Sequence, residues 1–398
     1  MARSTLRDQL PALANKTYFN YGGQGPLPRR SLEAITQAFE TIQELGPFSA
    51  AVWPYASRLI EGLRQRLGSE GWLGVGPRRL AFTENVTAGC VLPLWGLPWT
   101  AGDELLLSDA EHPGVVAACR ELARRHQLTI TSLPVADLRS SGEAAATAVL
   151  ERLEAALTPN TRLLVLSHLL WNTGQRMPIA AVARRLETAP KSPWLLVDGA
   201  QTLGAIPVAE AAQAADIYAC TGHKWCGGPE GLGVVALSER LLEQASPTLI
   251  GWRSLAEETA GTSGFHRDAR RFEVATSCTP LFAGLDQSLQ LLEAEGSAET
   301  RLQMIQARSG QLWRGLQDLP GLETLLQTEP PAGLVSFSLA PQGADPAADA
   351  AALVKALGER GLWLRTLADP ICLRACTHIT TTPEEVNQLL EVLAALRP

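Results

Sequence analysis

Short apolar runs alternate with longer amphipathic stretches over much of the chain. Between about residues 80 and 237 we predict strands, which lie at 79–82, 104–107, 128–131, 163–166, 194–197, 217–220 and 233–236. The alanine-rich segments between them repeat their apolar positions with a helical period. Strands that alternate with helices favour a mostly parallel sheet covered by helices, so the predicted fold class is α/β.

The pattern changes after about residue 255, where a stretch rich in Gly, Ser, Thr and Arg extends to residue 276. Beyond it we predict a smaller α+β domain, with helices over 281–316 and 348–359 and strands at 333–338, 362–365 and 371–374. The chain length also suits two domains. We therefore expect an N-terminal arm at 1–18 that packs with the small domain, a large domain at 19–258 and a small domain at 259–398.

Composition narrows the class of partner. The 398 residues carry a net charge of -7 and no basic cluster, which argues against nucleic acid or an anionic membrane as the main partner. The apolar runs are too short to cross a bilayer and the N-terminus has no apolar signal core. We therefore expect a soluble, cytoplasmic protein that acts on small molecules.

The seven cysteines include no Cys-x-x-Cys pair, which indicates a reducing compartment rather than a disulfide framework. Cys220, His223 and Cys226 are spaced as three possible metal ligands, and Cys372, Cys376 and His378 are further donors. Their spacing matches no established zinc pattern. No metal site is predicted.

Polar residues cluster at the ends of the predicted strands, where ligands gather in α/β sheets. Lys224, one of only four lysines, follows the apolar run at 217–220 in the sequence Thr221-Gly-His-Lys224. A lysine in a partly dry setting loses basicity and can act as a nucleophilic amine or form a Schiff base. The alternative is a lysine that extends from a strand end into solvent.

Two further strand ends suggest a cofactor. Asp198 ends a buried run, where its carboxylate would suit a protonated heterocyclic nitrogen such as that of pyridoxal phosphate (PLP), or would simply cap the next helix. Asn85, Val86 and Thr87 lie between a strand and a helix. Their free N–H groups would suit a phosphate, although an ordinary capped helix would look the same.

Candidate substrate contacts also follow strands. His112, in Glu111-His112-Pro113, could lie flat over a planar ring or transfer a proton, or it could be a solvated loop histidine. Arg374 and Arg365 each end a predicted strand and could form two hydrogen bonds to a carboxylate. Either could instead be an ordinary surface arginine.

Together these motifs resemble those of the class V aminotransferases, a family of PLP enzymes, and of the cysteine desulfurase group in particular. That group has Glu-His, Ser-His, Asp-x-Ala-Gln and Ser-Gly-His-Lys in this order, which here stand at Glu111-His112, Ser167-His168, Asp198-Gly-Ala-Gln201 and Thr221-Gly-His-Lys224. The resemblance extends from about Tyr18 to Arg374. It implies PLP as cofactor and the PLP-dependent aspartate aminotransferase-like fold, fold type I.

The resemblance also implies roles for the matching residues. Lys224 would bind PLP covalently and remove the substrate's Cα proton, Asp198 would pair with the pyridinium, and His112 would stack on the ring. Gln201 would bond the ring oxygen, and the phosphate would be held by Asn85, Val86, Thr87, Thr221 and His223. Thr276 matches a residue that reaches the phosphate of the neighbouring subunit, which implies a homodimer. The substrate would contact Arg374, Arg365, Gly23, Gln24, Trp171 and Asn172.

The segment between the two arginines bears on the reaction. Desulfurases carry a nucleophilic cysteine there on a mobile loop, but the segment 365–374 is too short for that loop, and Cys372 lies in an apolar, strand-like run. This short segment, together with 21–28 and 171–175, resembles the cysteine/cystine C–S lyases of the family.

A lyase of this type would act by β-elimination on cystine or cysteine. The products would be pyruvate, ammonia and a persulfide or sulfide that could supply a sulfur acceptor or an iron–sulfur apoprotein. A cysteine desulfurase, an epimerase and an aminotransferase remain alternatives on the same scaffold. A non-catalytic or nicotinamide-binding α/β protein is the alternative from another class, which the absence of a glycine fingerprint weakens.

Overall fold

The computed structural model describes residues 5–257, 264–340 and 343–396. Its largest sheet, within these ranges, has seven strands in the order β2-β8-β7-β6-β5-β3-β4. They are β2 (Leu80–Thr83), β3 (Glu104–Ser108), β4 (Thr129–Leu133), β5 (Thr161–Ser167), β6 (Trp194–Asp198), β7 (Ile217–Thr221) and β8 (Gly233–Leu237). Strands β3 to β7 are parallel, and β8 is antiparallel to β7 and β2. The predicted α/β class and mostly parallel sheet are confirmed, with every strand end within two residues of its prediction.

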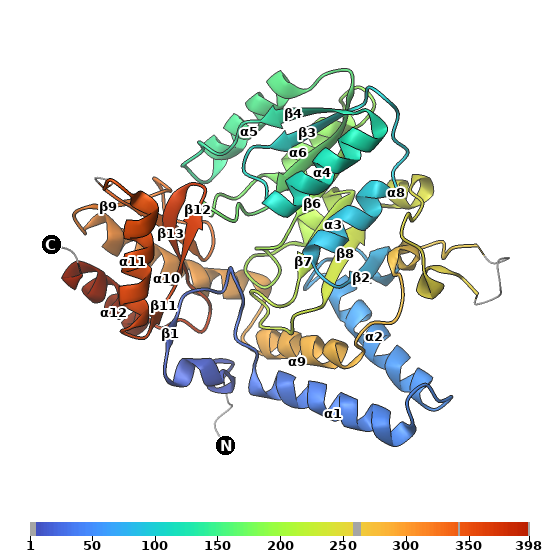
Figure 1. The fold of residues 1–398 in the computed structure, drawn as a ribbon, viewed down its shortest axis with the longest axis horizontal. Coiled ribbons are helices and arrows are strands. Elements are labelled where there is room, and N and C mark those ends of the chain that lie inside the picture. Colours follow the sequence, from blue (N-terminus) through green and yellow to red (C-terminus); the bar gives the residue numbers. More distant parts are fainter. Residues whose placement is uncertain (1–4, 258–263, 341–342, 397–398) are drawn as a thin grey trace.

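Helices cover both faces of this sheet (Figure 1). One apolar core, which includes Leu106 and Val197, lies on the side of α2 (Val52–Gly68), α5 (Glu143–Ala156), α6 (Ile179–Glu187) and α7 (Ala209–Ala214). The other, which includes Leu105 and Leu196, lies on the side of α3 (Val86–Trp95), α4 (Pro113–His126) and α8 (Glu239–Gln244). Because successive side chains point to opposite faces and both faces are covered, the strands are continuous apolar runs.

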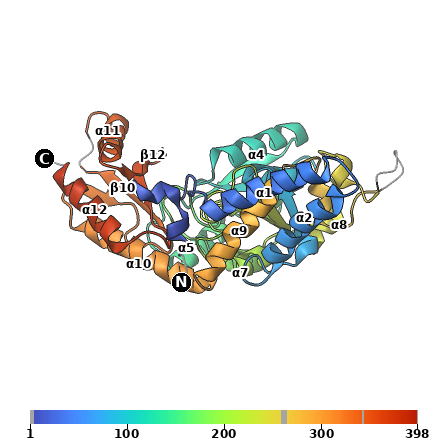
Figure 2. The same cartoon turned by 90° about the horizontal axis from the view of Figure 1, so that it is seen from below.

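The small domain contains an antiparallel sheet in the order β12-β13-β10-β9. Its strands are β9 (Leu322–Thr324), β10 (Leu334–Leu339), β12 (Arg365–Ala368) and β13 (Ile371–Cys376), and its helices are α10 (Ala298–Gln317), α11 (Pro346–Gly358) and α12 (Pro383–Ala395). These elements share a separate apolar core around Phe337 and Leu373. They form the smaller body at the left of Figure 2.

The helical stretch expected over 281–316 is two helices. Its first part, α9 (Pro280–Ala294), packs against α1 (Arg29–Leu45) and α2, on the large domain, whereas α10 packs against β9 and α12 (Figure 2). Gly296, with a φ of 128°, and the N-cap Ser297 separate them. A domain boundary at residue 258 stays a prediction, and this packing favours one after α9.

The described part of the N-terminal arm lies against the small domain. Strand β1 (Thr17–Tyr18) pairs in parallel with β11 (Leu362–Trp363). Arg7 forms an ion pair with Glu385 at 2.8 Å, and Phe19 enters the small-domain core. The chain that follows, 20–28, therefore passes from the small domain to the large one.

Candidate active site

Three parallel strands bring several of the predicted residues to one edge of the large sheet. His112 immediately precedes α4, which follows β3, Asp198 ends β6, and Lys224 lies three residues beyond β7. Asp198 and two arginines of the small domain, Arg374 and Arg365, lie close enough for their charges to shift the pKa of Lys224. The structure thus places these five side chains around one site.

Lys224 is held in a dry environment. Burial, reinforced by the charges of Arg374 and Arg365 and opposed by Asp198, lowers the pKa of its amine to about 8. Its backbone is packed against residue 25, where the Gly25 N–H donates to the His223 carbonyl at 2.8 Å. A Cβ at Gly25 would lie 2.0 Å from the Lys224 carbonyl oxygen, so only glycine fits.

This environment predicts how Lys224 reacts in cofactor-free protein. An amine attacks an acylating reagent only when it is neutral, so modification of Lys224 should rise with pH through a midpoint near 8. Mass spectrometry after pulses of reagent at several pH values measures this midpoint for each lysine. Free lysine, which has a midpoint of about 10.4, is the reference for the pH dependence, and the exposed Lys355 controls for access of the reagent. A midpoint for Lys224 equal to that of free lysine would contradict its buried setting.

Asp198 presents a buried carboxylate with spare hydrogen-bonding capacity. Its Oδ1 accepts a hydrogen bond from the Ala200 N–H at 2.8 Å, and no other described residue donates to it. Burial raises the pKa of this carboxyl, while Ala200, Lys224 and His112 lower it. A cationic N–H partner would satisfy the second oxygen, which is what a protonated pyridine nitrogen offers.

Glu111 supports this edge of the sheet, a role that the sequence reasoning did not assign. Its Oε1 accepts from Ser108 Oγ at 2.6 Å and from the Ser167 N–H at 2.7 Å, and its Oε2 accepts from Ser167 Oγ at 2.8 Å. It therefore ties the end of β3 to the end of β5. Burial, together with the Asp198 charge, raises the pKa of Glu111 to about 7. Its place beside His112 was the only signal in the sequence.

The first turn of α3 forms a cradle for an anion. Asn85 caps the helix, because its Oδ1 accepts from the Ala88 N–H at 2.9 Å, and the N–H groups of Val86 and Thr87 have no partner within the helix. Thr221 and His223 lie close together, with 2.7 Å between Thr221 Oγ1 and His223 Nδ1.

Gly233 brings the start of α3 and the pair Thr221 and His223 side by side. It pairs with Thr83 on one side and with Thr221 on the other. A Cβ on Gly233 would lie 2.7 Å from the Asn85 carbonyl carbon. The absence of a side chain therefore lets the start of α3 approach the end of β7, which is the arrangement a phosphate requires.

Gln201 and His112 are positioned by neighbours. The Gln201 Nε2 donates to the Gly22 carbonyl and its Oε1 accepts from Trp225 Nε1, both at 2.9 Å, which leaves one amide hydrogen for a ligand. The His112 Nδ1 accepts from the Gly114 N–H at 3.2 Å. Burial lowers the pKa of His112, so its imidazole is neutral near pH 7.

Arg374 has the clearest unmet hydrogen-bonding need. It is 1% exposed, and its Nη1 donates to the Trp171 carbonyl, but its buried Nε and Nη2 have no partner among the described residues. Nε and Nη2 form one edge of the guanidinium, which matches a carboxylate. Arg365 lies directly opposite Arg374 in the β12–β13 pair, so both side chains leave the same face of the sheet.

Trp171 and Asn172 reach the same place from the large domain. The Asn172 carbonyl accepts from Ser336 Oγ, and its Nδ2 donates to the Asp369 carbonyl at 3.3 Å. The Trp171 ring meets His112 edge to face, with 5.7 Å between ring centroids. Both residues therefore stand between His112 and the small-domain hairpin.

Three predicted residues lie less directly at the site. The backbone of Gly23 packs against the Asn20 side chain, where a Cβ would lie within 2.8 Å. Gln24 is exposed, and its carbonyl accepts from the Tyr18 hydroxyl at 2.7 Å. Thr276 is exposed on the loop before α9. Their roles stay predictions.

The described ranges contain neither a metal cluster nor a membrane-spanning helix. No group of three or more His, Cys, Asp or Glu side chains there could hold a metal ion. No helix among those residues has the length and apolar character needed to cross a membrane.

Comparison with known proteins agrees with this geometry. The class V aminotransferase family model matches residues 18–389. Isopenicillin N epimerase of Streptomyces clavuligerus is 31% identical over 407 residues, which cover 95% of this chain and 94% of that protein. A probable cysteine desulfurase of Pseudomonas aeruginosa is 30% identical over 347 residues, or 86% of this chain and 78% of that protein.

Solved structures match as well. The cystine C–S lyase C-DES, in complex with its reaction product cysteine persulfide, superposes with a TM-score of 0.90 at 45% identity and covers 98% of this chain and 100% of that chain. A C-DES variant with glycine covalently linked to the PLP cofactor matches with the same TM-score at 46% identity, over 98% of this chain and 99% of that chain.

The residues present fit PLP. The donors at the start of α3 suit its phosphate, the spare Asp198 oxygen suits its ring nitrogen, and the buried amine of Lys224 suits its aldehyde. Bound PLP supplies an electron sink for chemistry at the α-carbon of an amino acid. With fold type I architecture and PLP as its cofactor, the chain belongs to the class V aminotransferase family.

Proposed function

We propose that this protein is a PLP-dependent carbon–sulfur lyase that performs β-elimination on cystine, or on cysteine. The short connection between Arg365 and Arg374 carries this proposal. Their strands stay paired from Arg365↔Arg374 to Ala368↔Ile371, which leaves only Asp369 and Pro370 in the turn. A turn of this length has no room for a mobile loop with its own nucleophile.

Cys372, the cysteine within that hairpin, is a poor nucleophile. It is 1% exposed, and burial raises the pKa of its thiol to about 12. Since the thiolate is the reactive form, a desulfurase step that transfers sulfur to Cys372 is disfavoured. Elimination needs no protein cysteine, and the 45% identity to a cystine C–S lyase supports this reaction.

The side chains suggest a division of work in this reaction. Arg374, assisted by Arg365, would bind the substrate carboxylate and orient the Cα–H bond towards Lys224. The Lys224 amine, with its pKa near 8, would remove that proton. Cystine and water would then give pyruvate, ammonia and cysteine persulfide, whose anion leaves more easily than a simple thiolate. Cysteine would give sulfide instead.

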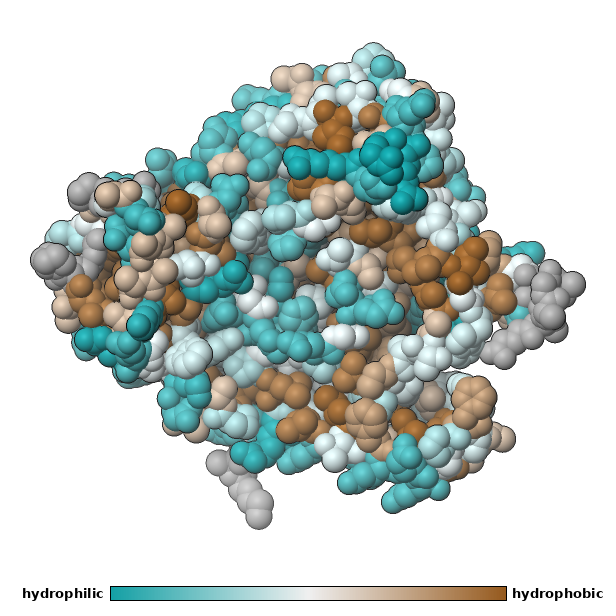
Figure 3. Space-filling view, viewed as in Figure 1, coloured by the Kyte–Doolittle hydropathy of each residue, from teal (hydrophilic) through white to brown (hydrophobic). Residues whose placement is uncertain are grey.

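The proposal includes a homodimer in which Thr276 reaches the partner's phosphate site. Large apolar side chains are exposed at Phe48, Trp53, Leu249, Ile250 and Trp252. Figure 3 shows apolar surface beside the segment that follows α8 and along α1. Such surface is typical of interfaces. The persulfide product would suit a sulfur acceptor such as an iron–sulfur apoprotein.

A Cys372→Ser variant tests the proposal against the desulfurase alternative. Because the lyase route does not use this thiol, pyruvate release from cystine should stay well within tenfold of wild type, a barrier change of less than about 1.4 kcal/mol. A coupled lactate dehydrogenase assay measures pyruvate, and the visible absorbance measures bound PLP. Loss of turnover with PLP retained would return the assignment to a desulfurase.

An epimerase is the second candidate, since the epimerase of Streptomyces clavuligerus aligns with nearly the whole chain. Epimerisation needs a proton returned to the opposite face of Cα, whereas elimination needs a leaving group at Cβ. L-alanine in D₂O distinguishes them because it has no leaving group. Deuterium with inversion at Cα would favour the epimerase, and deuterium with retention would favour the lyase.

A further inference from the structure

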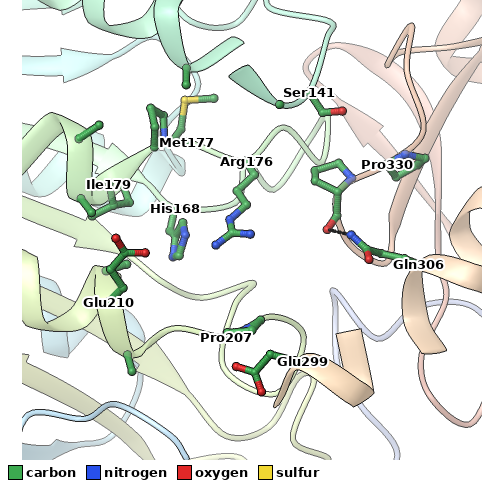
Figure 4. A pocket seen from close by; sticks show the side chains of 18 of the residues that line it. Ser141, His168, Arg176, Met177, Ile179, Pro207, Glu210, Glu299, Gln306 and Pro330 are labelled. Atoms are coloured by element: carbon green, nitrogen blue, oxygen red, sulfur yellow. Dashed lines mark hydrogen bonds between the residues drawn. The ribbon is translucent and has the colours of Figure 1, made fainter. Parts of the chain in front are cut away.

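A second cavity lies between the two domains, apart from the PLP site. Its volume is about 880 Å³, and it is lined by residues of α5, α6 and α7 on one face of the sheet (Figure 4). The phosphate cradle lies at the start of α3, on the other face. Polar side chains enter it from the large domain at Ser141, His168, Arg176, Arg184 and Glu210 and from the small domain at Glu299 and Gln306. We call this cavity the interdomain cleft.

His168 presents a hydrogen-bond acceptor to the cleft. It is 2% exposed, and its Nδ1 lies 2.9 Å from the Tyr218 hydroxyl, which lies 2.7 Å from Thr202 Oγ1. Thr202 Oγ1 donates its hydrogen to the Gly199 carbonyl at 2.8 Å. Tyr218 must therefore donate to Thr202, and His168 Nδ1–H must donate to Tyr218.

This ordering leaves Nε2 of His168 as a lone-pair acceptor without a hydrogen-bond partner among the described residues. Burial, with the charge of Arg176, lowers the pKa of His168 to about 3, so the ring stays neutral near pH 7. An acceptor that reaches the wall of a cavity is satisfied by a ligand or water that donates to it.

Arg176 supplies an unpaired cation beside that acceptor. Figure 4 shows its guanidinium next to His168 and directed into the cleft. No hydrogen bond or ion pair engages this guanidinium within the described part of the chain, and the same holds for Arg184 at the cleft wall. The first turns of α5, α6 and α10 also border the cleft, and their positive dipole ends favour an anionic group.

Carboxylates limit which anion fits. Glu210, in α7, and Glu299, in the first turn of α10, both line the cleft. A phosphate dianion would be repelled by these two groups. A ligand that carries one carboxylate and one ammonium matches both signs of charge, because its ammonium can donate to His168 Nε2 and to Glu210.

We propose that the interdomain cleft binds a small α-amino acid as its zwitterion, with the carboxylate on Arg176 and the ammonium between His168 and Glu210. This site is separate from the substrate site and goes beyond the proposed lyase activity. It lies at the base of the loop 169–176 of the large domain, which carries Trp171 and Asn172. This base is closed by the Met177 N–H, which donates to the His168 carbonyl at 2.9 Å, and by a β-bridge between Leu169 and Arg176. An occupant would therefore contact both the base of this loop and the small domain.

Isothermal titration with L-serine tests this site. The holoenzyme is first reduced with borohydride, so that no reaction occurs, and is compared with Arg176→Ala and Glu210→Gln variants. Both side chains are exposed and unpaired among the described residues, so both variants should fold. Loss of one charge-assisted contact should weaken binding about tenfold or more. Arg360→Ala, an exposed arginine outside the cleft, is the matched control and should bind as wild type does.

Single-charge analogues complete the test. Propionate and ethanolamine each keep one of the two charges, and both should bind more weakly than L-serine. Equal binding of propionate would reduce the site to a simple anion site, and unchanged binding in Arg176→Ala would place the ligand at the substrate site instead. Either result, or no binding up to about 10 mM, would overturn the proposal. Because the variants differ only in the cleft, the comparison stands whether or not the protein is a lyase.

Discussion

Replacing Lys224 with alanine should lower turnover by roughly a thousandfold or more, because the variant loses both the covalent anchor of PLP and the base that takes the Cα proton. The amine is suited to this work because its pKa of about 8 keeps a substantial minority of it neutral near physiological pH, where an ordinary lysine is almost wholly protonated. PLP should still bind noncovalently, since the α3 cradle and Asp198 are unchanged. The measurements are pyruvate release from cystine and the mass of the protein after borohydride reduction.

Lys355→Ala is the matched control for this substitution, because Lys355 is an exposed lysine in α11 of the small domain. It should keep wild-type turnover and a reducible link to PLP. Turnover of Lys224→Ala within tenfold of wild type, or PLP that can still be fixed covalently by borohydride, would remove Lys224 from the proposed role.

Replacing Arg374 with leucine should lower kcat/KM about a hundredfold or more, mostly through KM, because two charge-assisted hydrogen bonds to the substrate carboxylate are lost. The stability of the folded protein should fall by only about 1 kcal/mol, from loss of the Nη1 hydrogen bond to the Trp171 carbonyl, since the buried Nε and Nη2 have no partner among the described residues. Steady-state kinetics with cystine measure the first effect, and thermal unfolding measures the second.

Arg374→Lys sharpens this prediction, because lysine keeps the charge but cannot form the two-pronged contact. It should lie between wild type and the leucine variant. Arg360→Leu, outside the site, controls for general loss of an arginine and should match wild type. An unchanged KM in Arg374→Leu would show that the carboxylate binds elsewhere.

The large domain was predictable because its strands are buried on both faces. A run such as Leu163–Leu166 is apolar at every position, so its strand signal survives without knowledge of its neighbours. Helix boundaries were harder to predict, and α12 and β9 were missed. The break between α9 and α10 depends on Gly296 and Ser297, which sequence reasoning passed over inside a continuous helical period.

The candidate site was predictable as a set, not residue by residue. Taken alone, Asp198 could be a helix cap and His112 a solvated loop residue. The order of all the motifs along the chain indicated PLP. Long-range packing could not be predicted. Gly25 approaches Lys224, Trp225 and Gly22 hold Gln201, and Glu111 joins two strands, all through contacts between distant parts of the chain.

The ratio of the products formed when purified holoenzyme acts on cystine distinguishes the candidate reactions most directly. We expect one pyruvate and one sulfane sulfur, measured by cyanolysis, for each cystine consumed, with no alanine. Cystine left unconsumed, with alanine released from cysteine instead, would identify a desulfurase, and inverted cystine without pyruvate would identify an epimerase. Either result would contradict the assignment of this class V enzyme as a carbon–sulfur lyase.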